Sequence, residues 1–211
     1  MREPTAGAPA VLPLSLSPAL AETRVDAETR ANHIGQPTAT GCLPTITHAP
    51  KESAKCVAII DLVLKNFVVE YRIDNVILAG RWKANNLEAV AATLEWLQKQ
   101  RTVVTLVGPG PLYDAPVPRL AMVAMRRSDP EVFTRHLDKS MTQIARAMAA
   151  AAAAHHVPYL SLMDLVCTRA PRQENGHPCP EIFDQEHLNE EGSKLLALRI
   201  AQEWPDAGSL R

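Results

Sequence analysis

Apolar residues are arranged along this chain in two different patterns. Residues 53–71 and 85–100 repeat them at helical spacing, whereas residues 75–79, 102–107 and 157–161 are short continuous apolar runs. Such runs are typical of buried parallel strands, and their alternation with long helices indicates βαβ units. The pattern therefore predicts an α/β fold around a parallel sheet. The apolar positions that predict the two helices are Val57, Ile60, Leu64, Phe67 and Val68, and Leu87, Val90, Leu94 and Leu97.

Three further helices are predicted outside this central pattern. One covers residues 17–31, one runs from Asp129 as its N-cap to about His155, and one closes the chain within residues 184–203. Residues 1–13 are rich in Pro, Ala and Gly and predict an irregular lead-in.

The functional groups of a parallel sheet lie beyond the carboxyl ends of its strands. Three loops meet this condition: residues 80–82, residues 108–113 and the loop after Leu160. The Gly-Pro-Gly-Pro sequence at 108–111 is not a phosphate loop, because it lacks the Lys-Ser/Thr signature and its prolines remove backbone donors.

The composition fits one domain and argues against a nucleic-acid-binding surface and a membrane-spanning segment. The chain has 211 residues, of which 46% are apolar, and its formal net charge is -1. This length suits one α/β domain with a sizeable core. A nucleic-acid surface needs a concentrated positive field, which this charge does not supply. No apolar run reaches the roughly 18 residues that a membrane span requires.

The four cysteines form two local pairs, Cys42 with Cys56 and Cys167 with Cys179. Four cysteines allow three connectivities, and the sequential pairing is the economical one because each bridge would pin a loop that lacks other structure. Two bridges indicate an oxidising compartment, and the alternative is four unpaired cysteines in a cytosolic protein. A zinc site at Cys167, His177 and Cys179 would need a fourth ligand, so a loop disulfide is favoured and no metal is expected.

Asp184 and His187 are the most informative pair in the sequence. They are separated by two residues and stand just before a helix for which Asn189 is a suitable N-cap. At this spacing the carboxylate can orient the imidazole, which then acts as general base for a hydroxyl nucleophile. The alternative is a surface Asp and His beside a helix start.

Several stretches resemble one known family in their order along the chain. Residues 183–192 read Phe-Asp-x-x-His-Leu-x-x-x-Gly and resemble the fourth block of the SGNH hydrolases. The resemblance is closest to the SGNH domains fused to membrane acyltransferases that O-acetylate lipopolysaccharide and related glycans. Residues 16–22 resemble the helix after the family's serine, residues 40–44 its small-Gly-Cys-Pro loop, and residues 76–82 its strand ending in Arg-Trp. Together these stretches place an SGNH-like domain at residues 16–211, after a lead-in at 1–15.

The resemblance implies a three-layer, flavodoxin-like α/β/α fold and a set of roles. Asp184 would be the orienting acid and His187 the base. Gly41 would donate a backbone N–H to the oxyanion, while Arg81 and Trp82 would line the cleft. The alternative for Gly41 is a turn glycine beside a bridged cysteine, and for Trp82 a core aromatic that caps the strand.

The implied function is transfer of an acetyl group to a glycan hydroxyl in the periplasm. A membrane acyltransferase domain would supply the acetyl group and tether the chain to the inner membrane. The partners would therefore be that domain and an acceptor glycan, with no nucleic acid, and a serine acyl-enzyme requires no metal or diffusible cofactor.

The chain departs from the family at the nucleophile, because no Gly-Asp-Ser block is present. Ser15 is the candidate that remains, without the flanking Gly and Asp. The first strand is also weakly indicated, since Pro9 and Pro13 bracket residues 10–12 and proline removes a ladder donor. A truncated product of a larger membrane acyltransferase would explain both departures. The other interpretations are an SGNH esterase that uses water, and a glycan-binding remnant without catalysis.

Overall fold

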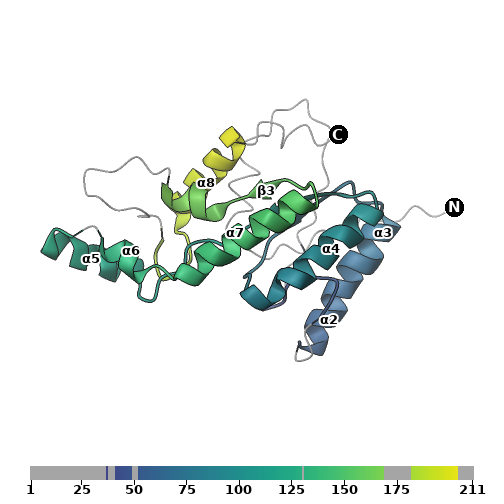
Figure 1. Cartoon of the computed structure of the whole chain (residues 1–211), viewed down its shortest axis with the longest axis horizontal. Coiled ribbons are helices and arrows are strands. Elements are labelled where there is room, and N and C mark those ends of the chain that lie inside the picture. Colours follow the sequence, from purple (N-terminus) through teal and green to yellow (C-terminus); the bar gives the residue numbers. More distant parts are fainter. Residues whose placement is uncertain (1–36, 38–40, 49–51, 130, 169–181, 204–211) are drawn as a thin grey trace, which may run out of the picture.

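The structure is a computed structural model that describes residues 37, 41–48, 52–129, 131–168 and 182–203 (Figure 1). The predictions of a lead-in, a first strand and a helix over residues 17–31 lie outside these residues, as do Ser15, His177 and Cys179.

The described sheet has three parallel strands in the order β1-β2-β3, which are Asn75–Leu78, Val103–Val107 and Tyr159–Leu160. Asn75 pairs with Val103, and Leu106 pairs with Tyr159. Each strand lies inside an apolar run of the sequence. The predicted α/β fold with a parallel sheet is therefore confirmed.

The first strand of this sheet is less buried than its apolar sequence predicts. Leu78 is buried, but Ile77 on the opposite face is 60% exposed, and Val103, which lies on that same face at the start of β2, is 53% exposed. The helices α4 (Leu87–Lys99) and α7 (Lys139–Ala154) contact one another (Figure 1), and their apolar residues form a core with Leu78, Val104 and Leu106. One face of the sheet is thus covered at β1 while Ile77 on the other remains open.

The helix predicted over residues 53–71 is one continuous helical segment with a π turn inside it. It consists of α2 (Ala54–Asp61), a π-helix (Leu62–Phe67) and α3 (Val68–Glu70). The buried residues recur at every fourth position. On a regular α-helix this spacing would rotate the buried face by about 40° around the helix axis at each step. The π turn has more residues per turn and therefore opposes this rotation. Phe67, predicted to face the core, is instead 46% exposed. The buried positions are Cys56, Ile60, Leu64 and Val68.

Helix α4 (Leu87–Lys99) follows a 3-10 turn at Ala84–Asn86 and matches its prediction. Val90, Leu94 and Leu97 are all almost completely buried. They pack against Leu106 on β2 and Met148 on α7 in the first core cluster.

The single helix predicted from Asp129 to about His155 is two helices, α6 (Val132–His136) and α7 (Lys139–Ala154). The chain is extended at Leu137, which forms an isolated bridge with Tyr113. Asp138, not Asp129, is the N-cap of α7, and its carboxylate accepts a hydrogen bond from the Ser140 N–H. The tertiary bridge therefore overrides the helical pattern.

Helix α5 (Val117–Arg127) was not predicted and lies with α6 at the end of the molecule opposite α2 and α3 (Figure 1). The closing helix α8 (Glu190–Glu203) was predicted, and Asn189 caps it by accepting a hydrogen bond from the Gly192 N–H at 2.7 Å. Apolar residues of α5, α6 and α8 form a second core cluster with a π turn at Asp164–Thr168. None of the described helices has the length and apolar character that crossing a bilayer requires.

Candidate active site

Two segments far apart in the sequence meet at the carboxyl end of the sheet. The loop after β2 donates the Tyr113 N–H to the Gln185 carbonyl at 3.0 Å. The first residue of α5, Val117, donates its N–H to the Asp184 carbonyl at 2.7 Å. The Asp184–His187 segment is therefore held by backbone bonds where a parallel sheet presents its functional groups.

The same segment is closed on itself as a tight loop. The Phe183 N–H donates to the His187 carbonyl at 2.9 Å, and Ile182 forms an antiparallel bridge with Leu188. Ile182 is buried in the second core cluster, which anchors the base of the loop. The tip with Asp184 and His187 thus projects from a fixed base.

The Asp184 carboxylate is held by three hydrogen bonds. Oδ2 lies 2.7 Å from Nδ1 of His187, and Oδ1 accepts the backbone N–H groups of Glu186 and His187, both at 2.8 Å. Desolvation by burial raises the pKa of Asp184, but these bonds to the charged form outweigh it and lower the pKa to about 2. The carboxylate is therefore ionised at neutral pH.

The His187 ring is placed to receive a proton from outside the protein. An ionised carboxylate only accepts hydrogen bonds, so Nδ1 carries the proton of the neutral ring and Nε2 keeps its lone pair. The side chain is 65% exposed, and its ring stacks against Phe183 at a centroid distance of 6.0 Å. The predicted pair is thus brought together in the geometry of an oriented general base.

Arg81 connects the loop after β1 to this pair. Its guanidinium lies 3.0 Å from the carboxylate of Glu186, between Asp184 and His187 in the sequence. The Arg81 side chain is 71% exposed, and an ion pair of this kind adds little stability. Arg81 thus lies beside a residue of the loop that bears the pair, and its predicted place in the cleft stays a prediction.

Trp82 lies in the core rather than on an open surface. It is 2% exposed, and its Nε1–H donates to the Val107 carbonyl at 2.7 Å. This placement matches the alternative of a core aromatic that caps the strand. The ring joins the carboxyl ends of β1 and β2, so it shapes the loop that presents Arg81.

The predicted bridge between Cys42 and Cys56 is confirmed. Next to it Gly41 has a φ of +78°, a left-handed conformation that explains why glycine occupies this turn. Leu43 and Pro44 pack against Gly80, where an added Cβ would lie 3.2 Å from Pro44 Cδ. The bridged loop therefore lies beside the loop after β1, and the role of the Gly41 N–H as an oxyanion donor stays a prediction.

Two predictions about cysteines and metals extend beyond the described residues. Cys167 lies within the π turn Asp164–Thr168, but Cys179 is outside the described part, so the second bridge stays a prediction. Within the described ranges, no group of three or more His, Cys, Asp or Glu side chains is arranged to hold a metal ion.

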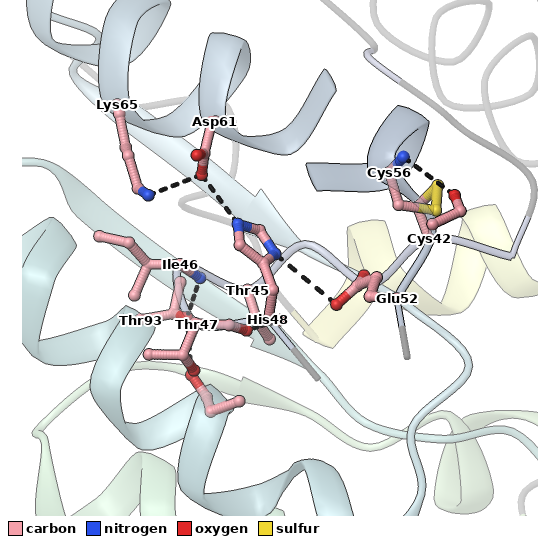
Figure 2. A network of polar contacts seen from close by, with 12 residues as sticks. Cys42, Thr45, Ile46, Thr47, His48, Glu52, Cys56, Asp61, Lys65 and Thr93 are labelled. Carbon is pink, nitrogen blue, oxygen red and sulfur yellow. Dashed lines mark hydrogen bonds and ion pairs between the residues drawn. A yellow bond between two sulfur atoms is a disulfide. The ribbon is translucent and has the colours of Figure 1, made fainter. Parts of the chain in front are cut away.

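A polar network that was not predicted surrounds His48 (Figure 2). Nε2 of His48 lies 2.9 Å from Asp61 Oδ1, and that carboxylate also contacts Lys65 at 2.8 Å. The Ile46 N–H donates to the Thr93 hydroxyl at 2.9 Å. The network fixes the loop that the disulfide closes onto α2 and α4, and no motif in the sequence marks it.

A second Asp–His pair was also missed. Nδ1 of His136 lies 2.7 Å from Asp114 Oδ1, and both side chains are solvent-accessible. The two residues are 22 positions apart, so no motif marked them.

The family model described as the SGNH domain fused to AT3 domains matches residues 15–202. A similar solved structure is the periplasmic domain of the lipopolysaccharide acetyltransferase of Salmonella ser. Paratyphi A, with a TM-score of 0.54 and 14% identity. The alignment covers 76% of this chain and 67% of that one, and at this identity it supports the fold. No curated protein sequence matches significantly.

Proposed function

This chain belongs to the family of SGNH domains that are fused to AT3 domains, and from that membership we propose that it transfers an acetyl group to a hydroxyl of a glycan. The observation that supports this most directly is the 2.7 Å contact between Asp184 and His187. Asp184 is ionised and anchored, and the Nε2 side of His187 faces away from it. This is the arrangement that a general base for a hydroxyl nucleophile needs.

The proposed reaction has two steps through an acyl-enzyme. A hydroxyl oxygen attacks the acetyl carbonyl carbon while His187 Nε2 takes its proton, and the bond to the donor's oxygen breaks as that proton is passed on to it. In the second step the glycan hydroxyl attacks the acyl-enzyme, His187 takes its proton, and the enzyme hydroxyl leaves with that proton. Asp184 stabilises the imidazolium in both steps.

Ser15 is the proposed source of the enzyme hydroxyl. It lies at the start of the family match, and the sequence contains no Gly-Asp-Ser block that would supply another candidate. The missing block favours a second candidate function, a glycan-binding domain without catalysis. An esterase that gives the acetyl group to water uses the same first step.

The proposed partner is a membrane acyltransferase domain that delivers the acetyl group, as the fusion named in the family description suggests. The Cys42–Cys56 disulfide supports an oxidising compartment. We place the chain on the periplasmic side of the inner membrane on these two grounds. The reaction as written needs no metal ion or diffusible cofactor.

The experiment is hydrolysis of 4-nitrophenyl acetate by the oxidised full chain. We expect His187→Gln to lower kcat/KM by about 100-fold or more, because general base catalysis contributes at least this much, and Ser15→Ala to remove the acyl-enzyme burst. The matched control is His156→Asn, which removes an exposed imidazole that could hydrolyse the reagent unspecifically. Asn tolerates the left-handed backbone at this position, where φ is 53°.

The three candidate functions give different results. Loss of activity in His187→Gln but not in His156→Asn supports the base, and acetylation of an added methyl glycoside, detected by mass spectrometry, separates transferase from esterase. Equal background rates in the folded wild type and in His187→Gln would reject catalysis by this pair. That result would favour the glycan-binding domain.

A further inference from the structure

An open groove with a volume of about 360 Å³ lies directly beside the candidate active site. This volume falls in the range of small-molecule sites, roughly 300–1,000 Å³. The groove shares the loop that bears the Asp184–His187 pair, because Gln185 is one of its lining residues. Its lining residues are Leu112, Tyr113, Asp114, His136, Leu137, Asp138 and Gln185.

The two walls of the groove are fixed to each other by backbone contacts. The Asp114 N–H donates to the His136 carbonyl at 3.0 Å, and the Asp138 N–H donates to the Leu112 carbonyl at 2.8 Å. The Tyr113 N–H ties the wall of residues 112–114 to the Gln185 carbonyl. A site held in this way is preorganised, so a ligand loses little binding energy to ordering it.

The side chains of the groove combine polar groups with apolar surface. Asp114 and His136 form their 2.7 Å pair at the rim, and both remain accessible to a ligand. Leu112 and Leu137 contribute apolar lining. A sugar ring presents vicinal hydroxyls beside an apolar C–H face, so this mixture suits a sugar better than a purely apolar or a phosphorylated ligand.

The negative charge of the groove favours a sugar that carries no negative charge itself. Asp114 and Asp138 are acidic, and none of the lining residues is Lys or Arg. A carboxylate or phosphate on the ligand would meet like charges here. Hydroxyl groups, in contrast, can donate hydrogen bonds to these carboxylates.

We propose that this groove binds the acceptor sugar, a neutral hexose or deoxyhexose, next to the Asp184–His187 pair. The inference rests on the proposed transfer to a glycan and identifies where the acceptor lies. Gln185 connects the groove to the pair, because its backbone holds the groove and it lies between Asp184 and His187 in the sequence. The groove residues thus determine which sugar is accepted.

The test is titration of the isotope-labelled full chain, followed by backbone amide shifts in NMR spectra. The probes are the neutral methyl glycosides of glucose, galactose and rhamnose, and methyl glucuronide as the anionic counterpart. We expect at least one neutral glycoside to shift amides at Tyr113, Asp114 and Gln185, and the glucuronide to bind more weakly. Gln185→Ala and Asp114→Asn should each weaken binding by about fivefold, the effect of one lost hydrogen bond.

The control is Asp74→Asn, which makes the same change of charge at an exposed residue just before β1, at the other end of the strands. Its affinity should equal that of the wild type. The proposal is overturned if no glycoside shifts the groove amides up to its solubility limit, if the shifts lie elsewhere, or if the glucuronide binds as tightly as the neutral sugars.

The two proposals, sugar binding and acyl transfer, can be rejected independently, because the sugar titration does not require the nucleophile. Sugar binding without His187-dependent hydrolysis would reject acyl transfer and leave the groove in place. His187-dependent hydrolysis without sugar binding would reject the groove and leave the acyl-enzyme chemistry.

Discussion

Trp82 and Val107 are joined by a hydrogen bond of 2.7 Å from the indole Nε1–H to the backbone carbonyl. Trp82 follows β1 and Val107 ends β2, so this single contact ties the carboxyl ends of two neighbouring strands. Arg81 and the loop after β2 extend from these ends towards the Asp184–His187 pair. This buried contact therefore fixes the two strand ends from which the loops near the candidate site extend.

Trp82→Phe should destabilise the fold by about 1–3 kcal/mol, because the buried Val107 carbonyl loses its donor. Trp82→Ala should cost more, about 3–5 kcal/mol, since it also leaves a cavity. Urea unfolding measures both values. Trp96→Phe is the matched control, because Trp96 packs against the same core but is only partly buried. A Trp82→Phe variant as stable as the wild type would show that the Val107 carbonyl finds another donor.

Gly108→Ala should be strongly destabilising because of Tyr159. A Cβ at Gly108 would lie 2.1 Å from the Tyr159 hydroxyl oxygen and 2.7 Å from Cζ, so the ring must move. Movement breaks the 3.0 Å bond that the hydroxyl donates to the Ala145 carbonyl. The control is Gly110→Ala, where nothing lies within 4 Å of the added atom.

The clash at Gly108 can be isolated by a double-mutant cycle. If Tyr159 is the cause, Gly108→Ala should cost less in a Tyr159→Ala background than in the wild type. Thermal unfolding of the four proteins gives the coupling free energy. Additive effects would mean that the backbone, not the ring, resists the substitution.

The disulfide between Cys42 and Cys56 should stabilise the chain by about 3 kcal/mol, the chain-entropy value for a loop of this size. The Cys42→Ser/Cys56→Ser double variant keeps Cys167 and Cys179 and removes only this bridge. Urea unfolding under oxidising conditions should show the loss, and reduction of the wild type should lower its stability at least as far. Equal stabilities would mean that the His48 contacts to Asp61 hold this loop without the bridge.

The features that the sequence predicted join residues that are close in the chain, whereas most of those it missed join residues that are far apart in the chain. The Asp184–His187 pair, the Asn189 cap and the Cys42–Cys56 bridge all join residues near one another in the chain, so spacing was enough to find them. Asp138 replaced Asp129 as the cap of α7 because residues 137 and 138 contact the loop at 112 and 113. Contacts of that range leave no periodic signal.

The same reasoning explains the errors at single residues. Phe67 fits a regular helical face, but the π turn shifts that face by its extra residue. Trp82 looks from its sequence context like a cleft residue, and only the position of the Val107 carbonyl 25 residues away shows that its polar edge points inward. The groove at Asp114 and His136 depends on three separate segments and was out of reach of any motif.

Arg81→Ala should change catalysis more than stability. The ion pair with Glu186 is largely exposed on the Arg81 side, so its loss should cost less than about 1 kcal/mol. If the pair positions the loop at Asp184 and His187, kcat for 4-nitrophenyl acetate should fall while KM stays constant. Arg81→Lys should restore part of the rate, and an unchanged kcat in Arg81→Ala would reject a positioning role.

Asp184→Asn should remove an acid-sensitive part of the stability. The pKa of Asp184 is lowered from 3.8 to about 2 in the folded chain. A carboxyl with a lowered pKa stabilises the fold above its unfolded pKa, and this contribution is lost as the pH falls through the folded value. The wild type should therefore lose it between about pH 4 and pH 2, whereas Asp184→Asn should show a flatter melting temperature over this window.

Asp74→Asn is the control for this pH dependence, because its carboxyl is exposed and lies away from the candidate site. It should follow the wild-type curve of melting temperature against pH. His187→Gln should also flatten the curve, but only in part, since the backbone N–H groups of Glu186 and His187 still stabilise the charged carboxylate. A curve for Asp184→Asn that parallels the wild type throughout would mean that these bonds do not form in solution, and the oriented base on which acyl transfer depends would then be absent.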